Sequence, residues 1–182
     1  MEKCPRCNHP RWKDKKEETD DSDDENEKRT KGKKIPHKVL RYFPLIPRLQ
    51  RLLMSAKTSS DMQWHKEKRR DDGILTHPAD AKAWKSFDTS FPQFASDPYN
   101  VRLGLCTDRF TPYGNINSTY SIWSVFLVPY NLLPWMCMKK PYIILNMIIP
   151  GKTTPGIDID VYLQPLIDEL KTLWHVGVNT YI

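Results

Sequence analysis

The 182-residue sequence has few glycines, few cysteines and no long apolar run. Its 7 glycines argue against a flexible linker protein rich in glycine and serine. The most apolar stretch, residues 141–150, has the length of a strand, whereas a membrane-spanning helix needs about 20 apolar residues. The N-terminus lacks the basic stub and apolar core of a secretory signal. We therefore expect an intracellular, reducing location with no membrane partner, in which the 4 cysteines do not form disulfides.

Apolar residues are also scarce along the whole chain. They make up 39% of the sequence, below the roughly 45–50% of an ordinary globular domain. The length suits about one domain, so part of the chain should remain outside any packed core. The 15 prolines indicate many short segments, because proline ends helices and interrupts central strands.

One acidic segment contains no apolar residue at all. Residues 14–27 carry nine acidic and two basic side chains, and nothing apolar lies between Lys13 and Thr30. Such a segment cannot bury enough surface to offset the entropy lost on ordering. We expect residues 14–35 to form a disordered linker. Its basic end, residues 28–34, is typical of a nuclear-import signal and favours a nuclear location.

The part of the chain that follows is basic and interleaved with apolar residues. Residues 28–70 carry fourteen basic and two acidic side chains. Ile46, Leu49 and Leu53 recur at helical spacing, and Ser59–Asp61 could cap a second helix. We expect residues 36–98 to form a basic helical region.

Six basic side chains on these two helices are candidates for DNA binding. Phosphates lie closely spaced along DNA, and basic side chains gain affinity by releasing condensed counterions. The alternative is that these charges form the solvated face of an ordinary helical pair. The candidates are Arg48, Arg51, Lys66, Lys68, Arg69 and Arg70.

Cys4 and Cys7 form a C-x-x-C knuckle, residues 1–13, that can offer two thiolates to one zinc ion. A structural zinc site needs four ligands. One possibility is half of a zinc ribbon whose other knuckle lies outside this chain. A second is a complete site with His9 and His37, and a third is no metal. Cys106 and Cys137 are expected to be small buried hydrophobes.

The pattern of residues 99–182 predicts three strands followed by a helix. Apolar residues alternate over 101–108 and run together over 122–128 and 142–149. A helix should begin at Asp158 or Asp160 and end near Gly177. The fold class is therefore α+β. Three antiparallel strands followed by a helix are also the opening half of a ribonuclease-H-like core.

Asp108 ends the first of these strands. In two-metal phosphoryl transfer, carboxylates held on a rigid sheet bridge metal ions about 3.5–4 Å apart. Asp108 could be one such carboxylate. It could equally be a turn-capping residue before Thr111 and Pro112, which is the more frequent role for aspartate.

Several longer strings resemble the transposase of plant CACTA-type (En/Spm) elements. The resemblance covers roughly residues 4–13 and 36–178 and implies a DDE/D-type transposase with a ribonuclease-H-like core that cuts and rejoins DNA with divalent metal. The strings are KVLRYFPLIPRLQRL at 38–52, DGILTHPAD at 72–80, AWKSFD at 83–88, FASDP at 94–98, NVRLGL at 100–105 and DIDVYLQPLIDEL at 158–170.

The resemblance assigns roles to particular residues. Asp108 matches the first catalytic carboxylate and would bind Mg²⁺, although Arg109 stands where the family usually has glycine. Cys4 and Cys7 match the second half of a zinc-binding element. The other two catalytic acids normally lie downstream of Ile182, since Asp158 and Asp160 are better explained as helix caps.

The sequence therefore predicts a transposase fragment that binds transposon-end DNA and other transposase chains but is catalytically incomplete. One alternative is a transposase-derived DNA- or protein-binding module without catalysis. Another is a zinc-knuckle adaptor unrelated to DNA. In a half core, the first strand lacks the neighbour that should cover it, so we expect it to pair with another chain or to aggregate.

Overall fold

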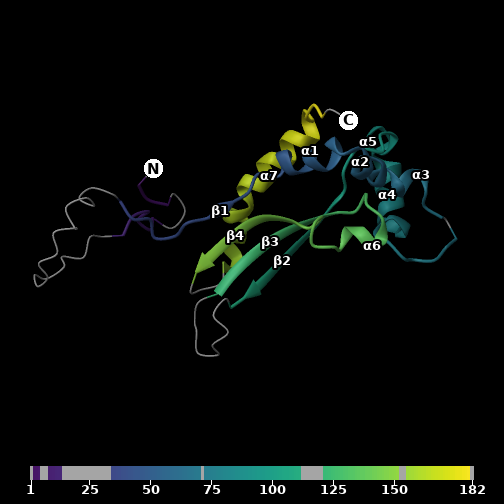
Figure 1. Cartoon of the computed structure of the whole chain (residues 1–182). Helices are drawn as coiled ribbons and strands as arrows, with labels where there is room; N and C mark the ends of the chain where they lie inside the picture. Colours follow the sequence, from purple (N-terminus) through teal and green to yellow (C-terminus); the bar gives the residue numbers. More distant parts are fainter. Residues whose placement is uncertain are drawn as a thin grey trace, which may run out of the picture. The chain divides into compact units, whose positions relative to one another are not determined.

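The computed structural model describes residues 2–4, 8–13, 34–70, 72–111, 121–151 and 155–180. The chain divides into two compact units, Met1–Val39 and Leu40–Ile182 (Figure 1). The acidic segment expected to be disordered lies outside the described residues. No helix in the described ranges has the length and apolar character needed to cross a membrane.

The small N-terminal unit is held together by short antiparallel bridges. One joins Lys3 to Pro10 and another joins Trp12 to Pro36. Backbone hydrogen bonds of 2.8 Å from Lys13 N to Ile35 O and 3.0 Å from His37 N to Arg11 O reinforce the second bridge. Residues 11–13 and 35–37 therefore pair with each other, although they are distant in sequence.

The larger unit is built on a four-stranded antiparallel sheet. The strands lie in the order β1 (Arg41–Tyr42), β4 (Ile144–Gly151), β3 (Ser121–Pro129) and β2 (Leu103–Phe110). The three long strands are neighbours in chain order, as the sequence predicted. The strand β2 lies at the edge of the sheet, where the described residues provide it with a partner on one side only.

Short helices and one long helix complete the mixed α+β architecture. The helix α7 is stabilised by a stripe of leucines facing the sheet and lies across one face of the sheet with α1 beside it (Figure 1). The helical elements are α1 (Ile46–Met54), α2 (Ala56–Met62), α3 (Trp64–Glu67), η2 (Pro78–Asp80), α4 (Lys82–Ser90), α5 (Pro92–Ser96), α6 (Pro134–Cys137), η3 (Gly156–Asp158) and α7 (Ile159–His175).

Two apolar clusters form the core. The first joins the sheet to α1 and α7 through residues such as Leu49, Leu127 and Leu166. The second includes Leu53 and Cys137. Cys137 is buried as expected, but Cys106 is exposed, so that expectation was wrong. Cys106 lies in the exposed part of the edge strand β2, whose residues from 105 onward are exposed.

The second helix begins earlier than the sequence predicted. Ser59–Asp61 lie inside α2, and Ser55, in an extended conformation, separates α1 from α2. Ser59 is buried, and its backbone N–H donates to Ser55 O at 2.8 Å, so it continues the helix instead of starting one. Asp158 does occupy the N-cap position of α7, although its side chain makes no capping hydrogen bond.

Candidate functional site

Every basic candidate except Arg69 is exposed. Arg48 and Arg51 lie one turn apart on the outer face of α1, and Lys68 and Arg70 follow α3. The guanidinium of Arg48 lies 5.6 Å from the ring centroid of Phe43. These four side chains therefore have their charges available to an external anion.

The remaining two candidates hold the fold together. Lys66 Nζ donates to Ala95 O at 3.2 Å and also to Ser96 O, the last carbonyls of α5. Arg69 Nη1 lies 3.1 Å from Asp80 Oδ1, and its side chain is only 20% exposed. The sequence did not show that these charges are used internally.

Asp80 is the centre of the turn that holds Arg69. Burial raises the pKa of Asp80, but hydrogen bonds from Arg69, Thr76 and His77 outweigh that effect and lower it to about 2. Its Oδ2 accepts from Thr76 N at 3.0 Å and from His77 N at 2.9 Å. His77 Nδ1 accepts from Ala79 N at 3.1 Å, which completes a capping box around η2. The T-H-P-A-D spacing at 76–80 could have signalled this role.

Asp108 is exposed on β2, and no acid lies opposite it. Its register partner is Ser124 on β3, and its Oδ1 accepts from the N–H of its neighbour Arg109 at 2.7 Å. In the described part of the chain, no three His, Cys, Asp or Glu side chains gather closely enough to hold a metal ion. Asp158 and Asp160 lie at the start of α7. Asp108 therefore stands without a second carboxylate in this region.

The backbone of Cys4 is hydrogen-bonded to Asn8 and His9. Asn8 N donates to Cys4 O at 2.9 Å, Cys4 N donates to His9 O at 2.9 Å, and Asn8 has a positive φ of 56°. The rings of His9 and His37 lie 4.8 Å apart between centroids. Cys7, the second predicted zinc ligand, lies outside the described residues.

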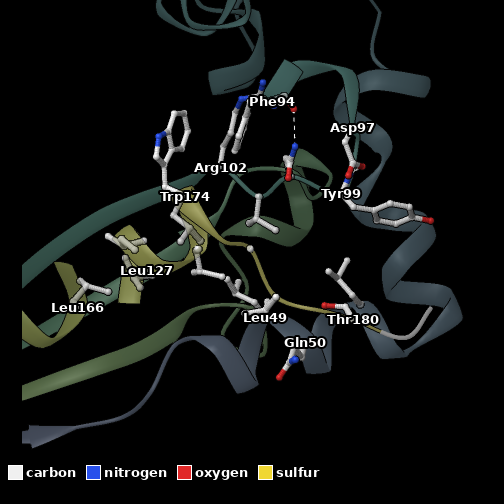
Figure 2. Close-up of a pocket in the computed structure, with 18 of the residues that line it drawn as sticks. Leu49, Gln50, Phe94, Asp97, Tyr99, Arg102, Leu127, Leu166, Trp174 and Thr180 are labelled. Atoms are coloured by element: carbon white, nitrogen blue, oxygen red, sulfur yellow. Dashed lines mark hydrogen bonds between the residues drawn. The ribbon is translucent and has the colours of Figure 1, made fainter. Parts of the chain in front are cut away.

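The structure also has a cavity that the sequence did not reveal. It has a volume of about 750 Å³ and lies between α7, the edge strand β2 and the helices α1, α4 and α5 (Figure 2). Its walls are mainly apolar, with Leu49, Leu127 and Leu166 among them. Asn100 Nδ2 closes one side by donating to Phe94 O at 2.8 Å.

Arg102 is the main charged group of this cavity. Its guanidinium lies 4.2 Å from the centroid of Trp84, 5.2 Å from that of Phe94 and 5.6 Å from that of Phe87. Asp88 pairs with it. Burial lowers the pKa of Arg102, while the Asp88 carboxylate opposes that shift. Because these aromatic residues come from α4 and α5, Arg102 ties those helices to the start of β2.

Comparison with known proteins gives one match. The family model described as "Transposase family tnp2" matches residues 72–182, which include the T-H-P-A-D turn, β2 with Asp108, and α7. No curated protein and no solved structure matches the chain.

Proposed function

Since that match spans more than half of its length, the chain belongs to the transposase family tnp2, and from this premise we propose that it is a DNA-binding fragment of a plant CACTA-type (En/Spm) transposase. Its partners are transposon-end DNA and other transposase chains, and it acts in the nucleus. The parent enzyme is of the DDE/D type, and this chain supplies its first catalytic carboxylate, Asp108. Family membership itself implies transposase-related function and DNA binding.

The observation that carries the proposal is the position of Asp108 within the matched region. Asp108 lies on the first of three consecutive antiparallel strands, which are followed by α7. This is the order of the opening half of a ribonuclease-H-like core. The free edge of β2 is where a further strand would be added, since a strand following α7 would pair there by a right-handed crossover.

The described residues do not complete a magnesium site. Two-metal chemistry needs several carboxylates around both ions, whereas β3, which adjoins β2, and β4, the next strand of the sheet, contain no acid. The lone Asp108 therefore does not fit a two-metal centre by itself, and Mg²⁺ would require carboxylates from elsewhere. The chain alone should consequently lack nuclease and strand-transfer activity.

The proposal also includes zinc binding by the N-terminal knuckle. Cys4 and Cys7 would be two of its four ligands, and the hydrogen bond from Asn8 N to Cys4 O keeps the described residues on either side of Cys7 close together. We assign them to half of a zinc ribbon whose other knuckle lies outside this chain.

A second candidate function is a transposase-derived DNA- or protein-binding module that never takes part in catalysis. The exposed basic side chains of Arg48, Arg51, Lys68 and Arg70, in a chain whose strands β2, β3 and β4 carry the single acid Asp108, favour it. The two candidates share the prediction of DNA binding. They differ in whether Asp108 becomes catalytic once further carboxylates are supplied.

The experiment is incubation of the purified chain with labelled duplex DNA in Mg²⁺, with binding and cleavage followed on the same samples. We expect binding without cleavage, and the same result for Asp108→Asn. Cleavage that Asp108→Asn abolishes would show a complete active site and contradict the proposed incompleteness. Absence of binding would contradict the proposed function itself.

A further inference from the structure

A small pocket beside the start of α1 is lined by Phe43, Pro44, Pro47, Arg48 and Arg51, and has a volume of about 290 Å³. We propose that it binds one unpaired nucleotide of single-stranded DNA. The base stacks on the Phe43 ring, and the arginines hold the adjacent phosphates. This inference rests on the proposed function and specifies that one part of the DNA-binding surface binds single-stranded DNA.

The Phe43 backbone is fixed to the sheet. Phe43 N donates to Asn146 O at 2.7 Å, and Asn146 Nδ2 donates to Phe43 O at 3.0 Å. Asn146 is fully buried on β4. Because both backbone groups of Phe43 are bonded to one buried residue, its position is set before any ligand arrives.

The start of α1 is fixed in the same way by Glu169 of α7. Its carboxylate accepts from Leu45 N at 2.7 Å, from Ile46 N at 3.4 Å and from the Tyr42 hydroxyl. Burial and the Glu169 charge raise the pKa of Tyr42, so this hydroxyl stays protonated and donates. The acceptor oxygens of Glu169 are therefore used at the start of the helix. The charged side chains that line the pocket are Arg48 and Arg51.

The chemistry of the lining suits a nucleotide. An aromatic ring next to cationic side chains is how proteins bind single strands, the ring stacking on the base and the cations pairing with phosphate. The planar guanidinium of Arg48, 5.6 Å from the Phe43 centroid, offers a second stacking surface. The volume is near the lower limit of about 300 Å³ for ligand pockets, which suits a single nucleotide.

The pocket also distinguishes single strands from duplex DNA. In a duplex, the faces of the bases are covered by their stacked neighbours, so no base can lie on Phe43. Pro44 and Pro47 are rigid and apolar, and neither supplies a side-chain donor for a phosphate. Duplex DNA can therefore use the charges of Arg48 and Arg51 but not the ring.

The test compares single-stranded oligo-dT with a duplex of equal length by fluorescence anisotropy on the full chain. Stacking on an aromatic ring contributes about 1–3 kcal/mol per base, and tenfold in affinity is 1.4 kcal/mol. Phe43→Leu should weaken single-strand binding by about tenfold and leave duplex binding unchanged. The matched control is Phe91→Leu, at another partly exposed phenylalanine, which should alter neither.

A second variant keeps the proposal testable if Phe43→Leu fails to fold. Arg48→Lys retains the charge but loses the planar stacking surface, so it should weaken single-strand binding alone. Equal losses on both substrates, or no loss on either, would overturn the pocket while leaving duplex binding and the proposed function intact. A wild-type chain that binds neither substrate would overturn both.

Discussion

Arg102 shows how a single charged side chain organises the neighbouring helices. It lies among Trp84, Phe87 and Phe94, and its side chain is only 12% exposed. Cation–π contacts contribute about 2 kcal/mol when the cation is desolvated. Its partner Asp88 is more exposed, at 37%, so the ion pair itself contributes less.

We therefore predict that Arg102→Leu lowers the free energy of unfolding by about 2 kcal/mol. Arg109→Leu, at an exposed arginine on β2, should change it by only about 0.5 kcal/mol. Urea denaturation followed by tryptophan fluorescence measures both. Equal stabilities for the two variants would show that the aromatic contacts of Arg102 contribute nothing.

His77 makes the stability depend on pH. Burial lowers the pKa of His77 from its ordinary 6.5, and its Nδ1 must stay unprotonated to accept from Ala79 N. The unfolded chain therefore takes up a proton more readily than the folded chain. The contribution of His77 to the free energy of unfolding is complete above about pH 6.5. It is lost as the pH falls through and below that value.

The expected result is a decrease in the free energy of unfolding between about pH 7 and about pH 5. His77→Asn should flatten this dependence, because asparagine can accept the same capping hydrogen bond without titrating. The flattening should be partial, since burial also lowers the pKa of His65. A His77→Asn variant with the full wild-type pH dependence would contradict this role.

The elements of the larger unit were mostly predictable, because hydrophobic periodicity reflects which faces are buried. The three long strands and α7 follow from it, as does α1 from the spacing of Ile46, Leu49 and Leu53. The strand β1 has only two residues and its position depends on pairing with β4, which leaves no local pattern. The short helices α5 and α6 do not follow from the rule that proline ends a segment, because each of them begins with a proline, which suits the first position of a helix.

The candidate site was less predictable than the fold. Charge alone does not tell a solvated lysine from one that caps a neighbouring helix, so Lys66 could not be separated from Lys68. The ion pair between Arg69 and Asp80 depends on a turn 11 residues away. The cavity around Arg102 depends on six helices and strands meeting in space, and no single segment carries its signature.

The edge strand β2 is the element most exposed to unwanted pairing. Unpaired strand edges associate with other chains unless a charge or proline interrupts them. The charges on β2, Asp108 and Arg109, lie near its end, and Leu105 is 55% exposed in the uncharged part before them. We predict concentration-dependent self-association of the wild-type chain, reduced by Leu105→Lys. Sedimentation velocity over a concentration series measures it.

The control for this prediction is Met54→Lys, which removes an even more exposed apolar side chain from α1. It should leave self-association unchanged, because α1 offers no free backbone groups for pairing. A monomeric wild-type chain throughout the concentration series would contradict the role assigned to β2.

Over the larger unit as a whole, the basic residues separate into two classes. The side chains of Lys66 and Arg69 bond to α5 and to Asp80. Those of Arg48, Arg51, Lys68 and Arg70 are exposed on or after the helices α1 and α3. The family match reaches from residue 72 to residue 182, so these exposed bases precede the matched region. We therefore propose that the helices before the sheet bind DNA. Asp108, on the strand β2, is proposed as the first catalytic carboxylate.

The most direct test of the central claim, that exposed bases on α1 bind DNA, is the salt dependence of duplex affinity. Each phosphate contact contributes about 0.9 to the slope of log affinity against log salt concentration. We predict that Arg48→Gln with Arg51→Gln lowers the magnitude of this slope by about 1.8. Lys139→Gln with Lys140→Gln, exposed after α6, should leave it unchanged. Equal slopes for the wild type and the arginine variant would contradict the account.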